Sequence, residues 1–388
     1  MKIKLRGRNA AQLFQNLPEG NALSGLVLIF CTIFSLLMSN SGCQEIYHKL
    51  WQIHFFSFSL LDLINDGLMT FFFFVVGLEI KKELLIGELT NPKKALLPFF
   101  CALGGMIAPA VIFIIFNAGT KNLSGWAIPT ATDIAFSVGI LAMLGKRIPL
   151  GLTVFLTALA IIDDLGAVVV IAVFYSHGLE YGNLVSALVL TGFLYILVRY
   201  FSFYNTVFLF VIGFFIWYFL HHSGVHATIA GVLLASVVPI SVKNKAILEP
   251  LAQRFHWSVN YLIVPLFALA NTAITLHGSF SETIFSTIGL GIVLGLLVGK
   301  PLGILVAAFF SVRLKLAELP SKVSWNLLFG TSILAGIGFT MSLFVSFLAF
   351  DDAARQDISK ISILLGSLLS AAFGYILLKK ITKNRQDF

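Results

Sequence analysis

The chain has 388 residues, of which 58% are hydrophobic and only 11% carry a charged side chain. Soluble domains carry about 25% charged residues, so this composition excludes an ordinary soluble enzyme or binding module and indicates an integral membrane protein. The formal net charge of +8 is compatible with nucleic-acid binding. Lys and Arg also collect in the cytoplasmic loops of membrane proteins, however, and we therefore predict a lipid bilayer, and no nucleic acid, as the partner.

Apolar runs recur along nearly the whole chain, and each has about 17 to 25 residues, the length of a helix that crosses a hydrocarbon core of about 30 Å. They predict an all-α polytopic membrane protein with about twelve transmembrane helices, which form a single transporter domain over residues 1–388. The expected spans are 21–39, 60–80, 95–116, 125–144, 150–175, 183–200, 204–220, 224–241, 257–275, 284–311, 326–350 and 360–379.

The basic residues indicate how these helices are oriented. Nearly all of the 26 Lys and Arg residues lie in alternate loops and at the two ends of the chain. The positive-inside rule places those loops and both termini in the cytoplasm. The basic residues of the opposite side are Lys49, Lys121, Arg355 and Lys360. One more, Lys300, falls inside the tenth span.

The most polar loop on the outer side, GCQEIYHKLWQIHFFSFS at 42–59, alternates polar and apolar residues around QIH. Alternation with period two is typical of strands, so we expect a short external β-hairpin here. The edge of an exposed hairpin can pair with a second copy of the chain, which suggests a homodimer. A plain structured loop is the alternative.

Two spans carry residues that weaken a helix at mid-depth. WAIPTATDIAFSVG (126–139) contains a proline, two threonines and an aspartate, and LAGIGFTMSLF (334–344) contains two glycines close together. Both spans should therefore unwind locally. Backbone freed at membrane depth is tolerated only where protein or a water-filled cavity receives it, so a pair of broken helices points to a transport site.

The two interrupted spans are the middle members of two three-helix groups, residues 95–175 and 284–379. The groups begin at the third and the tenth span, so an odd number of crossings separates them and they have opposite orientations in the membrane. This arrangement predicts inverted repeats in which the fourth and the eleventh helix are broken and cross.

Four charged residues lie at mid-depth in the expected spans: Asp133, Asp163, Asp164 and Lys300. A charge at the bilayer centre costs roughly 2.5 to 3.5 kcal/mol on insertion scales, so structure alone rarely explains two adjacent aspartates. Successive helical residues point about 100° apart, and the two aspartates should therefore have different roles. A closed ion-pair network, with Lys300 in a purely supporting role, is the alternative interpretation.

This set of three acids and one base suits an exchange of protons for cations. A protonated carboxyl is neutral, whereas an ionised one offers hard oxygen ligands to a small cation. The hydroxyls of Thr130 and Thr132 and the carbonyls freed by unwinding can complete the shell. Proton and cation then compete for one site, and access that alternates between the two sides of the membrane converts this competition into exchange transport.

Several segments closely resemble the NhaA-type sodium/proton antiporters of bacteria, and together they cover most of the chain. The family is itself a known example of inverted repeats with broken helices, so the resemblance and the predicted repeat are not independent. The segments are PTATDIAFSVGIL (129–141), LTALAIIDDLGAVVVIA (156–172), GLLVGKPLGI (295–304), AGIGFTMSLF (335–344), SGVHATIAGVLLA (223–235), INDGLMTFFFFVVGLEIKKEL (64–84) and NYLIVPLFALANT (260–272).

The resemblance implies a protein of the bacterial cytoplasmic (inner) membrane with twelve helices, both termini in the cytoplasm, and a homodimer joined partly through the external hairpin. It implies a secondary active antiporter, not an enzyme, that exchanges cytoplasmic Na+ or Li+ for external H+ and serves sodium and pH homeostasis. Electrogenic exchange is expected if both aspartates release a proton for each cation, and activation is expected at alkaline pH. No cofactor is expected.

The same resemblance implies roles for single residues. Asp163 and Asp164 match the family's ion-binding and proton-carrying pair, and Thr132 matches another residue of that site. Asp133 matches the acid that offsets the positive ends of the broken helices. Lys300 matches the lysine that offsets their negative ends and pairs with Asp163. Both offsets are physically reasonable, because each helix end carries about half a charge.

Charged residues near the cytoplasmic side resemble those of the family's pH response. In PLAQRFHW (250–257), however, Ala252 and Gln253 stand where the family's best-known member has an acid and a histidine, while Glu249 lies one turn away. The pH profile should therefore be shifted or flattened. Polar or solvated helix ends are the alternative explanation for all of the matching residues, which are Glu79, Lys82, Glu83, His226 and His256.

Three other mechanisms fit the sequence less well. GILAMLGKR (139–147) spaces its glycines wrongly for a phosphate-binding loop, so ATP is not the expected fuel. Asp133 and Asp163 are candidates for an intramembrane protease dyad, but isoleucines replace the glycine pattern that usually precedes the second acid. A proton-coupled symporter or channel on the same fold is a further alternative. The direction of proton movement relative to Na+ distinguishes it from an antiporter.

Overall fold

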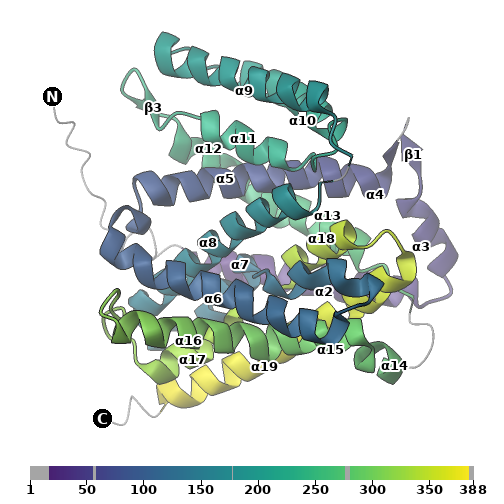
Figure 1. The fold of residues 1–388 in the computed structure, drawn as a ribbon, viewed down its shortest axis with the longest axis vertical. Coiled ribbons are helices and arrows are strands. Elements are labelled where there is room, and N and C mark those ends of the chain that lie inside the picture. The colour runs from purple at the N-terminus through teal and green to yellow at the C-terminus, as the bar shows by residue number, and fades with distance from the viewer. Residues whose placement is uncertain (1–16, 56–57, 177, 276–279, 384–388) are drawn as a thin grey trace.

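The computed structural model describes residues 17–55, 58–176, 178–275 and 280–383, and the chain is mostly helical. Figure 1 shows long helices, many of which run across the view and are joined by loops at its two sides. The two ends of the chain, for which the sequence predicts a cytoplasmic position, and the turn of the predicted hairpin at 56–57 lie outside the described residues.

Polar caps explain where several helices begin. The Asn205 side chain accepts hydrogen bonds from two amides of α10, and Ser286 accepts one from α15. These bonds satisfy amides that the first turn of a helix leaves free. The helical segments are α2 (Leu17–Ser39), α3 (Gln44–Trp51), α4 (Leu60–Asp62), η1 (Leu63–Leu68), α5 (Met69–Leu85), η2 (Glu88–Thr90), α6 (Pro92–Asn117), η3 (Lys121–Thr130), α7 (Ile134–Ala142), η4 (Gly145–Arg147), α8 (Leu150–Phe174), α9 (Tyr181–Phe201), α10 (Thr206–His221), α11 (Ile229–Val237), α12 (Leu248–Ser258), η5 (Val259–Ile263), α13 (Val264–Asn271), α14 (Phe280–Phe285), α15 (Thr287–Leu294), η6 (Gly295–Gly299), α16 (Lys300–Arg313), α17 (Trp325–Ala335), α18 (Phe339–Ala349) and α19 (Ala353–Lys383). The strands are β1 (His54–Phe55), β2 (Phe58–Ser59), β3 (Ser241–Val242) and β4 (Lys245–Ala246).

Within the described part of the chain, 7 helices are long and apolar enough to cross a membrane, or up to 9 if each of two bent pairs counts as one span. The clearest difference from the expected spans lies at 224–241, where residues 222–228 form turns and α11 has only 9 residues. At 1.5 Å per residue, α11 is roughly 14 Å long and covers less than half of a hydrocarbon core of about 30 Å. Apolar composition alone does not reveal this shortening.

The external loop differs from the predicted hairpin in its extent. β1 and β2 pair antiparallel, with His54 opposite Ser59 and Phe55 opposite Phe58, but each strand has only 2 residues. The earlier part of the loop forms the helix α3 instead. Its two buried aromatic residues, Tyr47 and Trp51, are one helical turn apart, and the helix places both against the protein.

The helices form two groups with a third set of elements between them (Figure 1). α5, α9, α10 and α11 lie in the upper part of the view, and α6, α15, α16, α17 and α19 lie in the lower part, with α7, α8 and α18 in the middle. In the lower group α6 and α16 lie so close that a Cβ atom on Gly104 would meet the backbone of Gly303. Such contacts between small residues are typical of helices packed within membranes.

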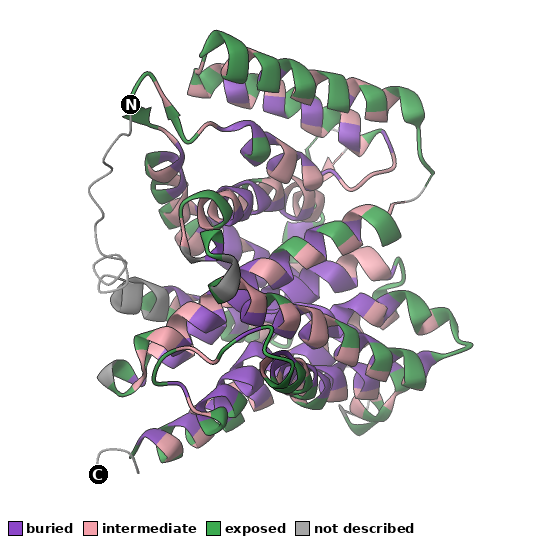
Figure 2. Ribbon diagram, turned by 60° about the vertical axis from the view of Figure 1, so that its left-hand side comes forward, coloured by how far each residue is buried: buried purple, intermediate pink, exposed green. Residues whose placement is uncertain are grey.

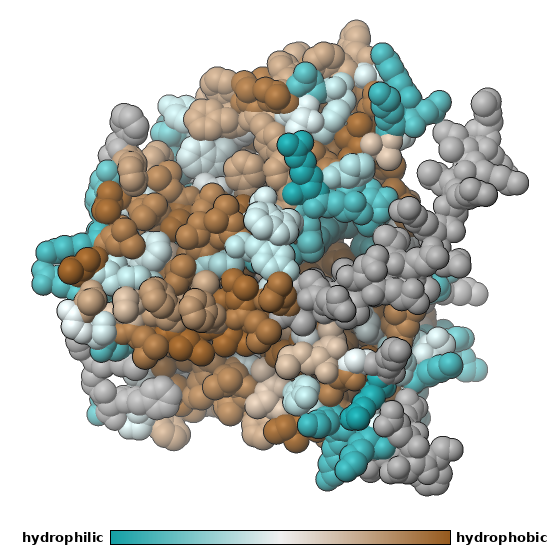
Figure 3. All heavy atoms as spheres, turned by 180° about the vertical axis from the view of Figure 1, so that it is seen from behind, coloured by the Kyte–Doolittle hydropathy of each residue, from teal (hydrophilic) through white to brown (hydrophobic). Residues whose placement is uncertain are grey.

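Burial and hydropathy both follow this arrangement. Figure 2 shows buried residues in the interior and exposed residues on the outer faces, above all on the uppermost helix, α9. The most apolar stretch of α9 is only 11% buried. Figure 3 shows hydrophobic residues over most of the rear face and hydrophilic residues gathered toward its left and right edges. An apolar middle between polar edges suits a bilayer, so the protein is a multi-pass membrane protein.

Both interrupted spans leave the helix within the segments that the sequence singles out. η3, a 3-10 helix, ends at Thr130, the backbone at 131–133 is not helical, and α7 begins at Ile134. α17 ends at Ala335 and α18 begins at Phe339, with a bend of 44° between them. α7 packs on α17 and η3 packs on α18, so the two broken helices cross at their breaks.

Candidate functional site

At this crossing, each broken helix satisfies backbone groups of the other. The Ser137 hydroxyl on α7 donates to the Leu334 carbonyl of α17 at 2.9 Å. The Ser342 hydroxyl on α18 donates to the Ile128 carbonyl of η3 at 2.7 Å. Backbone groups without partners cost several kcal/mol each at membrane depth, so these bonds let the two helices unwind where they do.

Asp133 joins the first turns of α7 and α18. Its Oδ1 accepts from the Phe136 amide at 3.1 Å, and its Oδ2 accepts from the amide of Thr340 at 3.1 Å and from its hydroxyl at 2.5 Å. The Asp133 amide donates to the Ile337 carbonyl at 2.7 Å. Free amides make a helix start partly positive, so an acid between two helix starts is favourable. Because both of its oxygens are engaged here, Asp133 is poorly placed for a protease dyad.

Lys300 lies on the other side of the crossing and is fully buried. Its Nζ donates to Asp163 Oδ2 at 2.6 Å and also to the Thr130 carbonyl. Because Thr130 is the last residue of η3, the ammonium group faces the negative end of that helix. The negative end of α17 is served differently, since its Ala335 carbonyl accepts from the Thr132 hydroxyl at 3.0 Å. Lys300 therefore contacts one of the two negative ends, and hydroxyl groups serve the other.

The Thr132 hydroxyl has two acceptors within reach but a single hydrogen. Its Oγ1 lies 3.0 Å from the Ala335 carbonyl and 2.6 Å from Asp163 Oδ2. It donates to both sites only in alternation, unless Asp163 carries a proton and donates to the hydroxyl itself. Thr132 thus lies between Asp163 and the carbonyl end of α17.

Asp163 Oδ1 differs from these atoms, because it is buried and has no hydrogen-bond partner among the described residues. Asp163 and its neighbour Asp164 are both only 2% exposed. Adjacent positions on α8 point about 100° apart, and of the two only Asp163 reaches Lys300. A buried acceptor without a donor costs about 1–3 kcal/mol, so a proton or a cation that binds here relieves that cost.

The acceptors at the crossing are all oxygen atoms. In the described ranges of the chain, no three His, Cys, Asp or Glu side chains lie close enough together to hold a metal ion. The acceptors at the crossing are carboxylates, hydroxyls and backbone carbonyls. These are hard oxygen ligands, which suit small hard cations better than transition metals.

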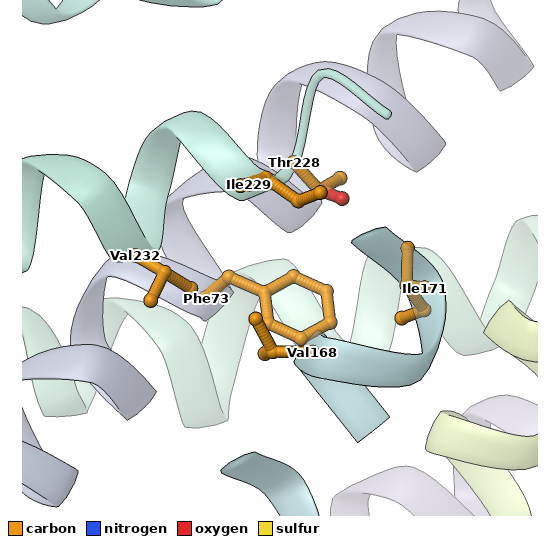
Figure 4. Close-up of a pocket in the computed structure, with 6 residues that line it drawn as sticks. All are labelled: Phe73, Val168, Ile171, Thr228, Ile229 and Val232. Carbon is orange, nitrogen blue, oxygen red and sulfur yellow. The ribbon is translucent and has the colours of Figure 1, made fainter. Parts of the chain in front are cut away.

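The charged side chains at the crossing are buried. Asp133, Asp163, Asp164 and Lys300 are at most 3% exposed. One helical turn along α8 from Asp164 lies a narrow pocket that is too tight for a water molecule. Figure 4 shows the ring of Phe73 in this pocket, between α5, α8 and α11. The other lining residues are Val168, Ile171, Thr228, Ile229 and Val232.

Comparison with known proteins decides the family. Residues 15–378 match the family model described as Na+/H+ antiporter 1. The chain belongs to this family. A Na+/H+ antiporter NhaA of Flavobacterium psychrophilum is 48% identical over 96% of this chain and 97% of the relative. Relatives of the same name from Cytophaga hutchinsonii and Pelagibacter ubique are 46% and 45% identical, over 96% and 97% of this chain and 96% and 99% of the relatives. The resemblance to NhaA-type antiporters is therefore confirmed.

Two ion pairs join α5 to α12 in this member of the antiporter family. Glu79 Oε1 lies 3.1 Å from His256 Nδ1, and Lys82 Nζ lies 3.4 Å from Glu249 Oε1. Hydrogen bonding to Glu79 raises the pKa of His256 above its usual value, although burial acts in the opposite direction. Position 252 is an alanine, and the acid that pairs with Lys82 is Glu249, one turn earlier on α12.

The remaining residues expected to take part in the pH response lie at different places. Glu83 is partly buried near the end of α5. His226 lies before α11, and its Nδ1 is 3.9 Å from Asp66 Oδ1, which is too far for a hydrogen bond. Asp66 precedes Glu79 by about 20 Å of helix, so His226 is not part of the α5–α12 ion pairs.

Several polar partners are not evident from the sequence. Asp66 lies in the second expected span but is not among the four charges that stand out at mid-depth. Thr340, Ser137 and Ser342 resemble the ordinary small polar residues of apolar spans, and only the juxtaposition of the two breaks shows that they bond to Asp133 or to freed carbonyls. Lys81 Nζ donates to two carbonyls at the end of α11, a contact that no sequence signal predicts.

Proposed function

We propose that the protein is a secondary active transporter that exchanges cytoplasmic Na+ for external H+. The observation that carries this proposal is a pair of adjacent buried acids, Asp163 and Asp164, of which Asp163 Oδ1 has no hydrogen-bond partner among the described residues. They lie next to helix breaks whose hydroxyls and carbonyls offer further oxygens. The curated relatives, which are named Na+/H+ antiporters, support the same function.

The exchange follows from two competing reactions at one site. When the site faces the cytoplasm, Asp163 and Asp164 release their protons and bind Na+ together with the Thr132 hydroxyl oxygen. When it faces outward, Na+ leaves and two protons replace it. Two protons that enter for each Na+ that leaves carry one net positive charge inward, so we infer electrogenic exchange driven by the proton gradient. Li+ is an even smaller hard cation and suits the same oxygens.

In this proposal Asp133 and Lys300 hold the crossing together and balance its charge. Asp133 offsets the partial positive charges of two helix starts, and Lys300 offsets the end of η3 and the charge of Asp163. Neither residue is assigned the carriage of a proton. The end of α17 needs no second lysine, because hydroxyl groups satisfy its carbonyls.

We also propose that the ion pairs between α5 and α12 make the exchange sensitive to pH. Glu79 raises the pKa of His256, so the charged pair is fully present below the ordinary histidine pKa of about 6.5 and is lost as pH rises through the raised value. Rising pH therefore loosens the contact between α12 and α5. This direction is the one expected of a transporter that is activated at alkaline pH.

We propose the remaining family architecture for the whole chain. It comprises about twelve helices in one domain over residues 1–388, with inverted repeats at 95–175 and 284–379. Support comes from the broken middle element of each group and from the packing of the two breaks against each other. The distribution of Lys and Arg supports cytoplasmic termini in a bacterial inner membrane. We place a homodimer contact at β1 and β2, on the outer side.

A vesicle assay tests the proposed exchange. Purified protein is reconstituted into vesicles that hold a pH-sensitive dye, a pH gradient is imposed, and Na+, Li+ or K+ is added across a pH series. We expect Na+ and Li+, but not K+, to drive protons in the opposite direction. Asp163→Asn and Asp164→Asn should each abolish this flux, while the matched change at an exposed acid, Asp351→Asn, should retain it.

Two results would contradict parts of the proposal. Protons that move in the same direction as Na+ would indicate a symporter. Retained Na+-driven proton flux in folded Asp164→Asn protein would remove the assignment of the site.

A further inference from the structure

We propose that the Ser370 hydroxyl of α19 and the Leu296 carbonyl of η6 form a latch, which is open in this structure and closes when the exchange site faces the opposite side of the membrane. The inference rests on the proposed exchange of Na+ for H+. It goes beyond that proposal because it gives α19, a helix that supplies none of the proposed ion ligands, a part in the change of access.

The acceptor of the latch is a carbonyl that its own helix leaves free. η6 is a π-helical turn, in which the Lys300 amide donates to the Gly295 carbonyl. That amide is therefore not available to the Leu296 carbonyl, and the next residue, Pro301, has no N–H. Leu296 is fully buried. Its carbonyl consequently receives no hydrogen bond from the following turn of the helix.

The donor of the latch is a hydroxyl group without a partner. Ser370 is fully buried, and its Oγ has no hydrogen-bond partner among the described residues. A helical serine often donates to the carbonyl four residues earlier, as Ser359 and Ser362 do on the same helix. Ser370 does not make this bond, so its hydrogen is available to another acceptor.

The two groups meet at Gly336, in the break between α17 and α18. A Cβ atom on this glycine would lie 2.4 Å from the Leu296 carbonyl oxygen and 2.9 Å from Ser370 Oγ. In this conformation a Cα hydrogen of Gly336 occupies that position, and it offers the carbonyl no more than a weak Cα–H···O contact. The glycine thus lies between a free donor and a free acceptor.

A small displacement of η6 relative to the end of α17 lets the hydroxyl and the carbonyl pair. A buried polar group without a partner costs about 1–3 kcal/mol, so a conformation that joins the two gains a hydrogen bond that this one lacks. Both elements border the exchange site, because η6 leads directly into Lys300 and the Ala335 carbonyl of α17 meets Thr132. A change of access that moves them relative to each other therefore opens or closes the latch, which stabilises one of the two access states.

The other side of the break is already attached to α19. Ser367, one turn before Ser370, accepts a hydrogen bond from the Phe339 amide at the start of α18, at 3.1 Å. This bond is present in the conformation in which the Ser370 hydroxyl is unpaired. α19 therefore holds the start of α18 in place, while its contact with η6 beside the end of α17 stays open.

The experiment first compares Ser370→Ala, Ser346→Ala and Ser367→Ala in thermal unfolding. Ser346 is the matched control, because it is equally buried and its hydroxyl is also unpaired among the described residues, but it lies two turns into α18, away from Gly336. The variants at 370 and 346 remove an unpaired hydroxyl and should keep or raise the Tm. Ser367→Ala removes the partner of a buried amide and should lower it.

The same variants are then reconstituted into vesicles, and the KM for Na+ is measured at each face of the membrane. The apparent affinity at one face falls with the fraction of protein that faces it. Loss of the latch shifts the protein toward the conformation in which the latch is open. Ser370→Ala should therefore change the ratio of the two KM values by about fivefold, the factor that corresponds to one net hydrogen bond. Ser346→Ala should keep this ratio within about twofold of wild type.

Three results would overturn the inference: an unchanged ratio in Ser370→Ala, an equal change of the ratio in Ser346→Ala, or a loss of Tm in Ser370→Ala as large as that in Ser367→Ala. If Ser370→Ala does not assemble, Ser370→Cys, which donates only weakly, replaces it, and an unchanged ratio there also counts against the latch. A wild-type protein without Na+-driven exchange refutes the proposed function itself, whereas a working exchanger with an unchanged ratio refutes only the latch.

Discussion

Replacing Lys300 by methionine tests whether the buried ion pair stabilises the crossing of the two broken helices. Methionine has a similar length and no charge, so the change leaves the packing volume nearly intact. It deprives two acceptors, Asp163 Oδ2 and the Thr130 carbonyl, of a donor. Removal of one partner from a buried pair costs about 3–5 kcal/mol, because the other charge stays buried without compensation. The Lys300 and Asp163 side chains are 0% and 1% exposed, so solvent does not reduce this cost.

A second change in the same molecule separates the charge from the packing. Asp163→Asn removes the orphaned charge, and a neutral buried pair is often as stable as an ionic one. The double variant should therefore be more stable than Lys300→Met alone, with a coupling free energy of about 2–3 kcal/mol. Thermal unfolding in detergent measures both effects, and we expect the melting temperature of Lys300→Met to fall by on the order of 5–10 °C.

An exposed ion pair provides the matched control. Lys49 and Glu45 lie 2.6 Å apart, as Lys300 and Asp163 do, but their side chains are 70% and 82% exposed. Lys49→Met should therefore cost less than about 0.5 kcal/mol. A Lys300→Met protein as stable as Lys49→Met, or a double variant less stable than the single one, would refute the argument that this pair compensates a buried charge.

Three further predictions concern Asp133 and the contact between α5 and α12. Asp133→Asn should lower stability by about 2–4 kcal/mol, because one amide oxygen replaces two carboxylate oxygens that serve two helix starts, and unchanged thermal unfolding would contradict this. His256→Gln removes the titrating partner of Glu79, so the pH midpoint of Na+-driven exchange should move to lower pH, and an unmoved midpoint would exclude His256 from regulation. Glu249→Gln breaks a pair with Lys82 whose side chains are 28% and 45% exposed, for Lys82 and Glu249 respectively. The free energy of unfolding should therefore fall by less than about 1 kcal/mol, as measured by thermal unfolding. A larger fall would contradict the argument that solvent screens this pair.

Sequence reasoning identifies the residues at the crossing because the cost of a buried charge is visible in the sequence itself. Asp133, Asp163 and Lys300 stand out against apolar neighbours, and the structure brings all three to one place. The hydrogen-bond partner of each charge is harder to predict from the sequence. Nothing in the sequence shows that Asp133 bonds to Thr340 or that Lys300 faces η3 but not α17, because these contacts depend on the angle at which the two broken helices cross.

The sequence also does not predict the length and type of two secondary-structure elements. The apolar stretch 224–241 has the length of a membrane helix, but turns occupy its first part and α11 is left with 9 residues. At the C-terminal end of α11, the Lys81 ammonium group donates to the carbonyls of Ser236 and Val238. In the external loop, Tyr47 and Trp51 are both buried by a helix where alternation suggests a strand. In both segments tertiary contacts, not local propensity, decide the outcome.

In the proposed exchange, the balance of charge at the crossing gives Asp164 the central role. Asp133 is offset by two helix starts, each of which carries about half a positive charge. Asp163 is offset by Lys300. The hydroxyls of Thr132 and Ser137 satisfy the end of α17 without adding charge, and no basic side chain of the described residues forms an ion pair with Asp164. An ionised Asp164 is therefore stable at this depth only when a cation is bound, and otherwise it must hold a proton. In the proposed exchange, this requirement couples the release of a proton from Asp164 to the binding of a cation.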